Sequence, residues 1–243
     1  MQLLSCHNGQ LHTDKIPDKI SAWTGSKTKS FTTGLTALDE LLPNAVFARG
    51  AVHELLALPS HPAPFFLALF FARSASNQPN SFSGSIVWCD PQRKIYPPAV
   101  ASLGVPLDRL FLLRPQTIED ENWAIAECLR CRGVSATIAS PRRLSRIEAR
   151  RFQLAAERGG GVAILLRRYD RAANIYAAAT RWLVSPAPGE RTVQRWKIQL
   201  IHGHGGRIGQ AVILEHHREN NAIQVHTLHQ ARELANRPVS KTA

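Results

Sequence analysis

Short apolar runs alternate along the chain with segments whose apolar residues follow the spacing of a helix. The apolar runs are typical of strands buried on both faces of a parallel sheet, and they read AVHELLAL, SIVWCD, RLFLL, SATIA and GVAILL. Helical spacing predicts helices in TTGLTALDELL, FFLALFFARSA, PPAVASLGV, TIEDENWAIAECLRCRG and RLSRIEARRFQLAAERG. The expected helix ends carry typical signals, with Thr117 as an N-cap and Gly104, Gly133 and Gly159 after last turns.

The pattern changes beyond Pro188, where QRWKIQLIHGHGGRIGQAVILEHH predicts two strands about a glycine-rich turn. The preceding segment, IYAAATRWLV, fits either a strand or a helical piece. Strands alternating with helices and followed by a hairpin predict an α/β fold: a mostly parallel sheet, helices on both faces and a C-terminal antiparallel β-hairpin. We expect residues 1–30 to be a polar N-terminal extension, 31–228 to be the α/β domain and 229–243 to be a C-terminal tail.

Composition narrows the class of protein. Hydrophobic residues make up 44% of the chain and charged residues 20%, which is typical of a globular protein. The four cysteines form no regular framework, the first residues have no basic leader, and the longest apolar stretch, from Phe65 to Ala72, is too short to span a membrane. These features predict a cytoplasmic protein.

Positive charge is concentrated in one part of the chain. The formal net charge is +12, and the segment from Arg130 to Arg171 holds eleven arginines against three acidic residues. Three of these arginines recur every four residues, namely Arg142, Arg146 and Arg150, and two more flank them, Arg143 and Arg151. These five would line one helical face with guanidinium groups. Such a face could bind nucleic acid, bind an acidic protein partner or simply be solvated.

Two pairs of potential metal ligands lack further support. His202 and His204 lie two residues apart in IHGHGG, but no third ligand is evident, so an ordinary polar turn is the expectation. Cys128 and Cys131 have CxxC spacing at the end of a predicted helix, without a second pair, and are interpreted as small core residues. We therefore expect no metal site.

The order of motifs resembles the RecA-type recombinase core. TTGLTALDELLPNAVFARGAVHELLA resembles the helix and strand that lead into the phosphate loop, and IVWCDPQRKIYPPAVASLGVPLDRLFLLRPQT resembles the second and third strands. The resemblance covers roughly residues 31–228. Within this superfamily the chain most resembles the ImuA group, on HELLALPS, RRFQLAAERGGGVAILLRR and WKIQLIHGHGGRIGQAVILEHH. The SulA cell-division inhibitors resemble it more distantly.

The resemblance places a phosphate loop where the residues cannot form one. The loop positions fall on residues 57–64, and the degenerate positions are Ala57, Pro59, Pro62 and Pro64. Proline lacks an N–H donor, and neither Lys nor Thr ends the loop, so nucleotide binding is not expected. Gln92 stands where the resemblance expects a catalytic Glu, and Ser140 where it expects a metal-orienting Asp. We therefore expect no catalytic residues, no cofactor and no ATPase activity.

The resemblance to ImuA implies a non-catalytic accessory protein in DNA damage-induced translesion synthesis (SOS mutagenesis). The implied partners are an ImuB-type Y-family polymerase homologue and an error-prone replicative-type DNA polymerase, with RecA and DNA as further candidates. The alternative is a SulA-like cell-division inhibitor that binds FtsZ. A neighbouring polymerase-like gene would favour the first interpretation.

Overall fold

The computed structural model describes residues 2–7, 10–13, 29–77, 84–170 and 177–228. The strands are β1 (Gln2–His7), β2 (Gln10–Thr13), β3 (Ser30–Phe31), β4 (Phe47–Ala48), β5 (Ala51–Ala57), β6 (Ser85–Cys89), β7 (Leu110–Pro115), β8 (Val134–Ala139), β9 (Val162–Arg168), β10 (Thr180–Ala187), β11 (Val193–Gly203), β12 (Ala211–His217) and β13 (Ala222–Thr227). The helices are α1 (Thr36–Asp39), α2 (Phe65–Ser76), α3 (Pro97–Ser102), α4 (Ile118–Arg130) and α5 (Arg146–Gly159), with 3-10 turns η2 (Pro43–Ala45) and η3 (Leu107–Arg109).

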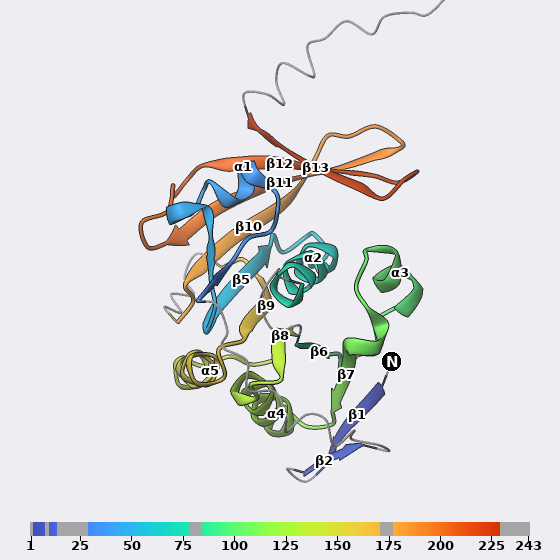
Figure 1. Cartoon of the computed structure of the whole chain (residues 1–243), viewed down its shortest axis with the longest axis vertical. Coiled ribbons are helices and arrows are strands. Elements are labelled where there is room, and N and C mark those ends of the chain that lie inside the picture. The colour runs from blue at the N-terminus through green and yellow to red at the C-terminus, as the bar shows by residue number, and fades with distance from the viewer. Residues whose placement is uncertain (1, 8–9, 14–28, 78–83, 171–176, 229–243) are drawn as a thin grey trace, which may run out of the picture.

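One twisted sheet runs through the molecule, from β13 at one end to β2 at the other (Figure 1). Its strand order is β13-β12-β11-β10-β5-β9-β8-β6-β7-β1-β2, and β3 pairs with β4 separately. Neighbours from β10 to β1 are parallel, whereas β10 to β13 and the pair β1–β2 are antiparallel. The predicted fold class is confirmed, and the ambiguous segment before the hairpin contributes the strand β10.

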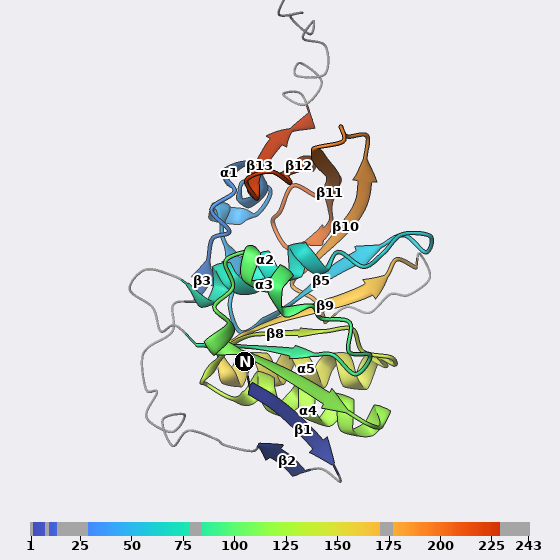
Figure 2. The same ribbon diagram turned by 90° about the vertical axis from the view of Figure 1, so that its right-hand side faces the viewer.

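Helices cover both faces of the parallel part of the sheet. Figure 2 shows α2 and α3 on one side and α4 and α5 on the other. Successive strand side chains alternate between the two layers: Ile86 and Trp88 of β6 pack in the core under α2, whereas Val87 and Cys89 pack against α4 and α5. Both faces are buried, which explains why these strands have continuous apolar runs.

Local side-chain contacts shorten two of the predicted helices. In the first, only Thr36–Asp39 is helical, because the carboxylate of Asp39 turns back to accept hydrogen bonds from the hydroxyl of Thr33 (2.6 Å), its backbone N–H (3.1 Å) and the N–H of Gly34 (3.2 Å). In the second, α5 begins at Arg146, after a capping box in which the Ser145 hydroxyl accepts from the backbone N–H of Glu148. The predicted cap of α4 by Thr117 is confirmed.

Part of the predicted N-terminal extension joins the sheet, since β1 pairs in parallel with β7. The boundary at residue 30 stays a prediction, and the tail at residues 229–243 lies outside the described residues. No helix within the described ranges is long and apolar enough to cross a membrane.

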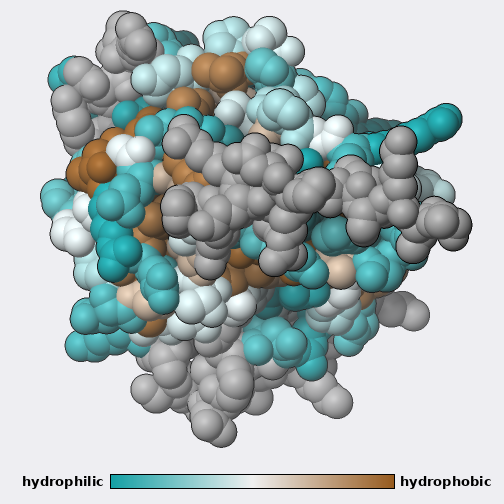
Figure 3. Space-filling model, turned by 90° about the horizontal axis from the view of Figure 1, so that it is seen from above, coloured by the Kyte–Doolittle hydropathy of each residue, from teal (hydrophilic) through white to brown (hydrophobic). Residues whose placement is uncertain are grey.

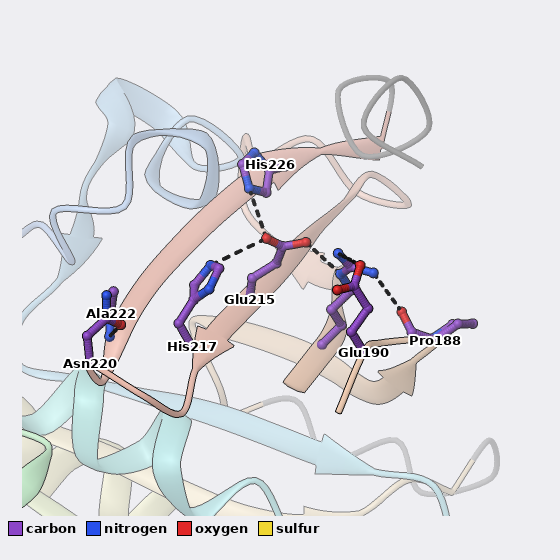
Figure 4. Close-up of polar contacts among 8 residues, drawn as sticks. Pro188, Glu190, Glu215, His217, Asn220, Ala222 and His226 are labelled. Carbon is purple, nitrogen blue, oxygen red and sulfur yellow. Dashed lines mark hydrogen bonds and ion pairs between the residues drawn. The ribbon is translucent and has the colours of Figure 1, made fainter. Parts of the chain in front are cut away.

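Polar side chains connect neighbouring strands at the antiparallel end of the sheet. Glu215 of β12 is 7% exposed, and its carboxylate accepts from Nε of Arg195 on β11 at 2.6 Å. The imidazoles of His217 and His226 point at the same carboxylate (Figure 4), with Nε2 to Oε2 distances of 3.8 and 3.4 Å. The surface of this end is mostly hydrophilic with hydrophobic residues interspersed (Figure 3).

Candidate functional site: a degenerate phosphate loop and an arginine-rich helix

The segment between β5 and α2 occupies the position predicted for a phosphate loop. Two of its backbone donors are used within the segment: the N–H of His61 donates to the carbonyl of Leu58 at 2.9 Å, and the N–H of Phe65 donates to the carbonyl of Ala63 at 2.9 Å. Pro64 is the N-cap of α2, and its side chain makes no capping bond. A loop with its donors in use and prolines among its residues has few free N–H groups for an anion.

A guanidinium group contacts this loop. Arg168, the last residue of β9, donates from Nη1 to the carbonyl oxygen of Leu58 at 3.0 Å and to the carbonyl oxygen of His61. The loop therefore presents acceptors to a cation, whereas a phosphate-binding loop presents donors to an anion. These carbonyl oxygens carry the wrong polarity for coordinating a phosphate through the backbone, and they hold the Arg168 guanidinium in hydrogen bonds of its own.

A pocket of about 380 Å³ lies beside the loop, at the carboxyl ends of β6, β8 and β9. It brings together three of the sequence-predicted positions, Pro62, Gln92 and Ser140, with Arg167 and Arg168. The remaining degenerate positions do not line it: Ala57 is buried at the end of β5, Pro59 is exposed, and Pro64 lines a neighbouring pocket of about 340 Å³ beside Trp196 of β11.

The polar groups at the catalytic positions already have structural partners. The carboxylate of Asp90 accepts from the backbone N–H groups of Lys94 at 2.9 Å and Ile95 at 3.1 Å, so it holds the chain after β6. The hydroxyl of Ser140 donates to the carbonyl of Leu166 at 3.2 Å. Gln92 is exposed at the pocket wall. An amide can orient a water molecule but cannot accept its proton, so no general base stands at that position.

A buried ion-pair group lies next to the loop. The carboxylate of Glu54, which is 1% exposed in β5, accepts from Nη1 of Arg167 on β9 at 3.0 Å and from Nε of Arg181 on β10 at 2.8 Å. These two pairs join three adjacent parallel strands. No sequence motif pointed to Glu54, Arg167, Arg168 or Arg181 as site residues. The available signal was an acidic residue inside an apolar strand and an Arg pair at the end of another.

Among the described residues, neither the histidine pair at positions 202 and 204 nor the cysteine pair at positions 128 and 131 belongs to a cluster that could hold a metal ion. The rings of His202 and His204 lie 5.4 Å apart, and burial, followed by the neighbouring charges of His204 and Arg181, lowers the pKa of His202. Cys128 is buried against the sheet in α4, and Cys131 is the half-buried C-cap of the same helix. The interpretation as a small core residue is confirmed for Cys128, whereas Cys131 is only partly buried against that core.

The five predicted arginines do not share one helical face, which corrects the expectation. Arg146, Arg150 and Arg151 lie on α5 and are exposed, whereas Arg142 and Arg143 precede the helix because Ser145 caps it. The Arg142 side chain turns toward α4, where its Nε donates to Oε2 of Glu121 at 2.9 Å; the Glu121 side chain is fully buried. Arg142 is thus a partner of a buried acid.

The fold and this site define an α/β protein with a mixed, mostly parallel sheet, in which an arginine binds the carbonyl oxygens of the loop after the interior strand β5. The chain is a distant homologue of Protein ImuA of Caulobacter vibrioides, in strains NA1000 and ATCC 19089, with 25% identity over 210 residues. The alignment covers 78% of this chain and 85% of the relative. No family model matches the chain.

Proposed function

We propose that this protein is a non-catalytic accessory factor in DNA damage-induced translesion synthesis, which recruits or regulates error-prone polymerase components. The distant homology to Protein ImuA supports the proposal, together with the motifs that resemble the ImuA group. The proposed partners are an ImuB-type Y-family polymerase homologue and an error-prone replicative-type DNA polymerase, with RecA as a further candidate. The protein would act in the cytoplasm, where these partners work.

The contact of Arg168 with the β5–α2 loop is the observation that carries the non-catalytic part of the proposal. A nucleotide phosphate would have to displace a guanidinium from the carbonyls of Leu58 and His61, and would then meet a loop in which prolines and internal hydrogen bonds leave few backbone donors. Gln92 and Ser140 give no general base or metal ligand in compensation. We therefore infer that the domain acts by binding partners at its surface and not by hydrolysing ATP.

Nucleotide binding gives a direct biochemical test. We expect no heat of binding when Mg-ATP is titrated into the protein, and no phosphate release with or without single-stranded DNA. The variant Arg168→Ala removes the guanidinium, and it should also fail to bind ATP because the prolines remain. Saturable ATP turnover that Gln92→Ala abolished would refute the non-catalytic proposal.

A cellular test separates the proposed function from its alternative. Deletion of the gene should lower the frequency of DNA damage-induced mutation, and the wild-type gene and Gln92→Ala should both restore it. A SulA-like inhibitor would instead produce filamentous cells without division rings when overexpressed, and its deletion would leave induced mutation unchanged. That second pattern would overturn the proposal.

A further inference from the structure

One face of α5 combines exposed apolar and cationic side chains. The face comprises Ile147, Arg150, Arg151, Leu154 and Arg158, which we call the α5 outer face, and all five are exposed. Their spacing of three, four, seven and eleven residues from Ile147 places them along a single side of the helix. The opposite side packs on the sheet through buried residues such as Phe152.

The helix presents this face from a fixed position. Ser145 and Glu148 form a reciprocal capping box at its first turn, and Gly160 ends it in the left-handed conformation with φ +69°. Figure 2 shows α5 beside α4 on the outside of the sheet. A capped helix packed along one side loses little conformational entropy when the other side binds a partner.

The apolar part of the face is unusually accessible. Ile147 is 81% exposed and Leu154 is 38% exposed, and they are two of the five large hydrophobic residues that are exposed within the described ranges. They lie seven residues apart, two helical turns along the same side. Contact with apolar side chains of a partner would remove this area from water, which is favourable.

The cationic part lacks internal acidic partners. Arg150 donates to the side-chain oxygen of Gln153 at 2.8 Å, and Gln153 in turn donates to Glu157 at 3.0 Å, so one arginine is loosely linked to one acid. Within the described residues, no acidic side chain forms an ion pair with Arg151 or Arg158. Arginine between apolar residues is typical of the centres of protein interfaces.

We propose that the α5 outer face is the docking site for an acidic amphipathic helix of a partner protein. Apolar side chains of that helix contact Ile147 and Leu154, and its carboxylates pair with Arg150, Arg151 and Arg158. Nucleic acid matches the face less well, because a phosphate backbone satisfies the arginines but leaves Ile147 in water. The proposal rests on the proposed function only in assigning that helix to a polymerase component.

The test uses the full chain and two defined probes. The first probe is a fluorescent peptide with leucines on one helical face and glutamates on the others, compared with a scrambled peptide of the same composition. The second is a fluorescent oligothymidylate. The variants are Ile147→Ser with Leu154→Ser, which keeps every charge, and Arg151→Gln with Arg158→Gln, which keeps the apolar side chains. Ile208→Ser with Arg207→Gln, at the exposed β11–β12 turn, is the matched control.

The proposal predicts that the patterned peptide binds more tightly than the scrambled one. Each α5 double variant should weaken that binding by roughly ten-fold or more, because central interface residues carry most of the binding energy. The control should bind as wild type. Equal binding of both peptides, or unchanged binding by the serine variant, would refute the proposal. Oligothymidylate binding that needs Arg151 and Arg158 but not Ile147 would also refute it and assign the face to nucleic acid.

Cells carrying the same variants separate the two proposals. If deletion of the gene lowers damage-induced mutation and the serine variant restores it fully, the docking proposal fails while the proposed function stands. If deletion has no effect on induced mutation, the proposed function fails whatever the peptide measurements show. Circular dichroism and thermal melting of each variant verify that the fold is retained.

Discussion

His53 in β5 should make the stability of the fold fall steeply in mild acid. Its side chain is fully buried, and burial lowers its pKa from 6.5 to about 4. Its Nε2 lies 2.9 Å from the carbonyl oxygen of Ala48, which can only accept, so Nε2 carries the proton. Its Nδ1 then accepts from the hydroxyl of Thr180 at 2.7 Å, and that hydroxyl oxygen in turn accepts from the indole N–H of Trp182 at 2.8 Å.

The sign and size of the effect follow from the two pKa values. The unfolded chain takes up a proton at His53 below about pH 6.5, whereas the folded chain does so only near pH 4, so the folded state is favoured less as the pH falls between these values. Over the whole window the cost is about 3 kcal/mol, and at about pH 5 it is about 2 kcal/mol. Above about pH 6.5 both states are neutral at this residue and the effect vanishes.

Urea unfolding of wild type and His53→Gln at about pH 7.5 and about pH 5 measures the effect. The variant should be less stable at the higher pH because it loses buried hydrogen bonds, but its further loss in acid should be smaller by about 2 kcal/mol. Parallel losses in wild type and His53→Gln, or an NMR titration of the His53 ring near pH 6.5, would refute the reasoning.

Three further substitutions test contacts around α5, each by urea unfolding at neutral pH. Arg142→Ala leaves the buried carboxylate of Glu121 without its guanidinium and should cost about 2 kcal/mol, whereas Arg143→Ala should change stability by less than about 0.5 kcal/mol; equal effects would contradict the assigned ion pair. Ser145→Ala removes the capping box and should lower the free energy of unfolding by about 1 kcal/mol; an unchanged free energy would show that the cap does not stabilise α5. Gly159→Ala drives a Cβ into backbone carbonyls at the end of α4 and should cost about 2 kcal/mol or more, so a wild-type midpoint would refute that close approach.

The sequence was sufficient to predict the fold because the strands of the parallel sheet are buried on both faces. A continuous apolar run such as VAILL in β9 has few other stable places in a globular protein. Helix boundaries depended on single side chains instead. The carboxylate of Asp39 shortens α1, and the hydroxyl of Ser145 sets the start of α5 one turn later than the spacing of the arginines indicated. Such side-chain contacts with the backbone end a helix locally, and the spacing of apolar residues along the sequence does not reveal them.

At the candidate site, only the replacement of phosphate-loop and catalytic residues could be predicted from the sequence. The prolines and Gln92 are visible as substitutions at expected positions, but the partner of the loop is not. Arg168 lies 110 residues from Leu58 in the chain, and its contact depends on β5 and β9 being neighbours with Ala57 opposite Arg168. Arg142 was misassigned for the related reason that its partner, Glu121, belongs to another helix. Sequence spacing describes neighbours on one element, whereas these pairs depend on the packing of several.

The replacements at the former phosphate position depend on one another. Prolines in the loop have no N–H group to donate to neighbouring carbonyl oxygens. Arg168 instead donates to two carbonyl oxygens of the loop, those of Leu58 and His61. Beside it, Arg167 and Arg181 neutralise Glu54, so the charged groups at this edge of β5, β9 and β10 are used to join strands. Restoring one element, such as a lysine in the loop, would add a cation next to Arg168 without creating backbone donors. The edge that resembles a nucleotide site therefore contributes structural support, while exposed charge without an acidic partner remains on the α5 outer face, where we expect binding to occur.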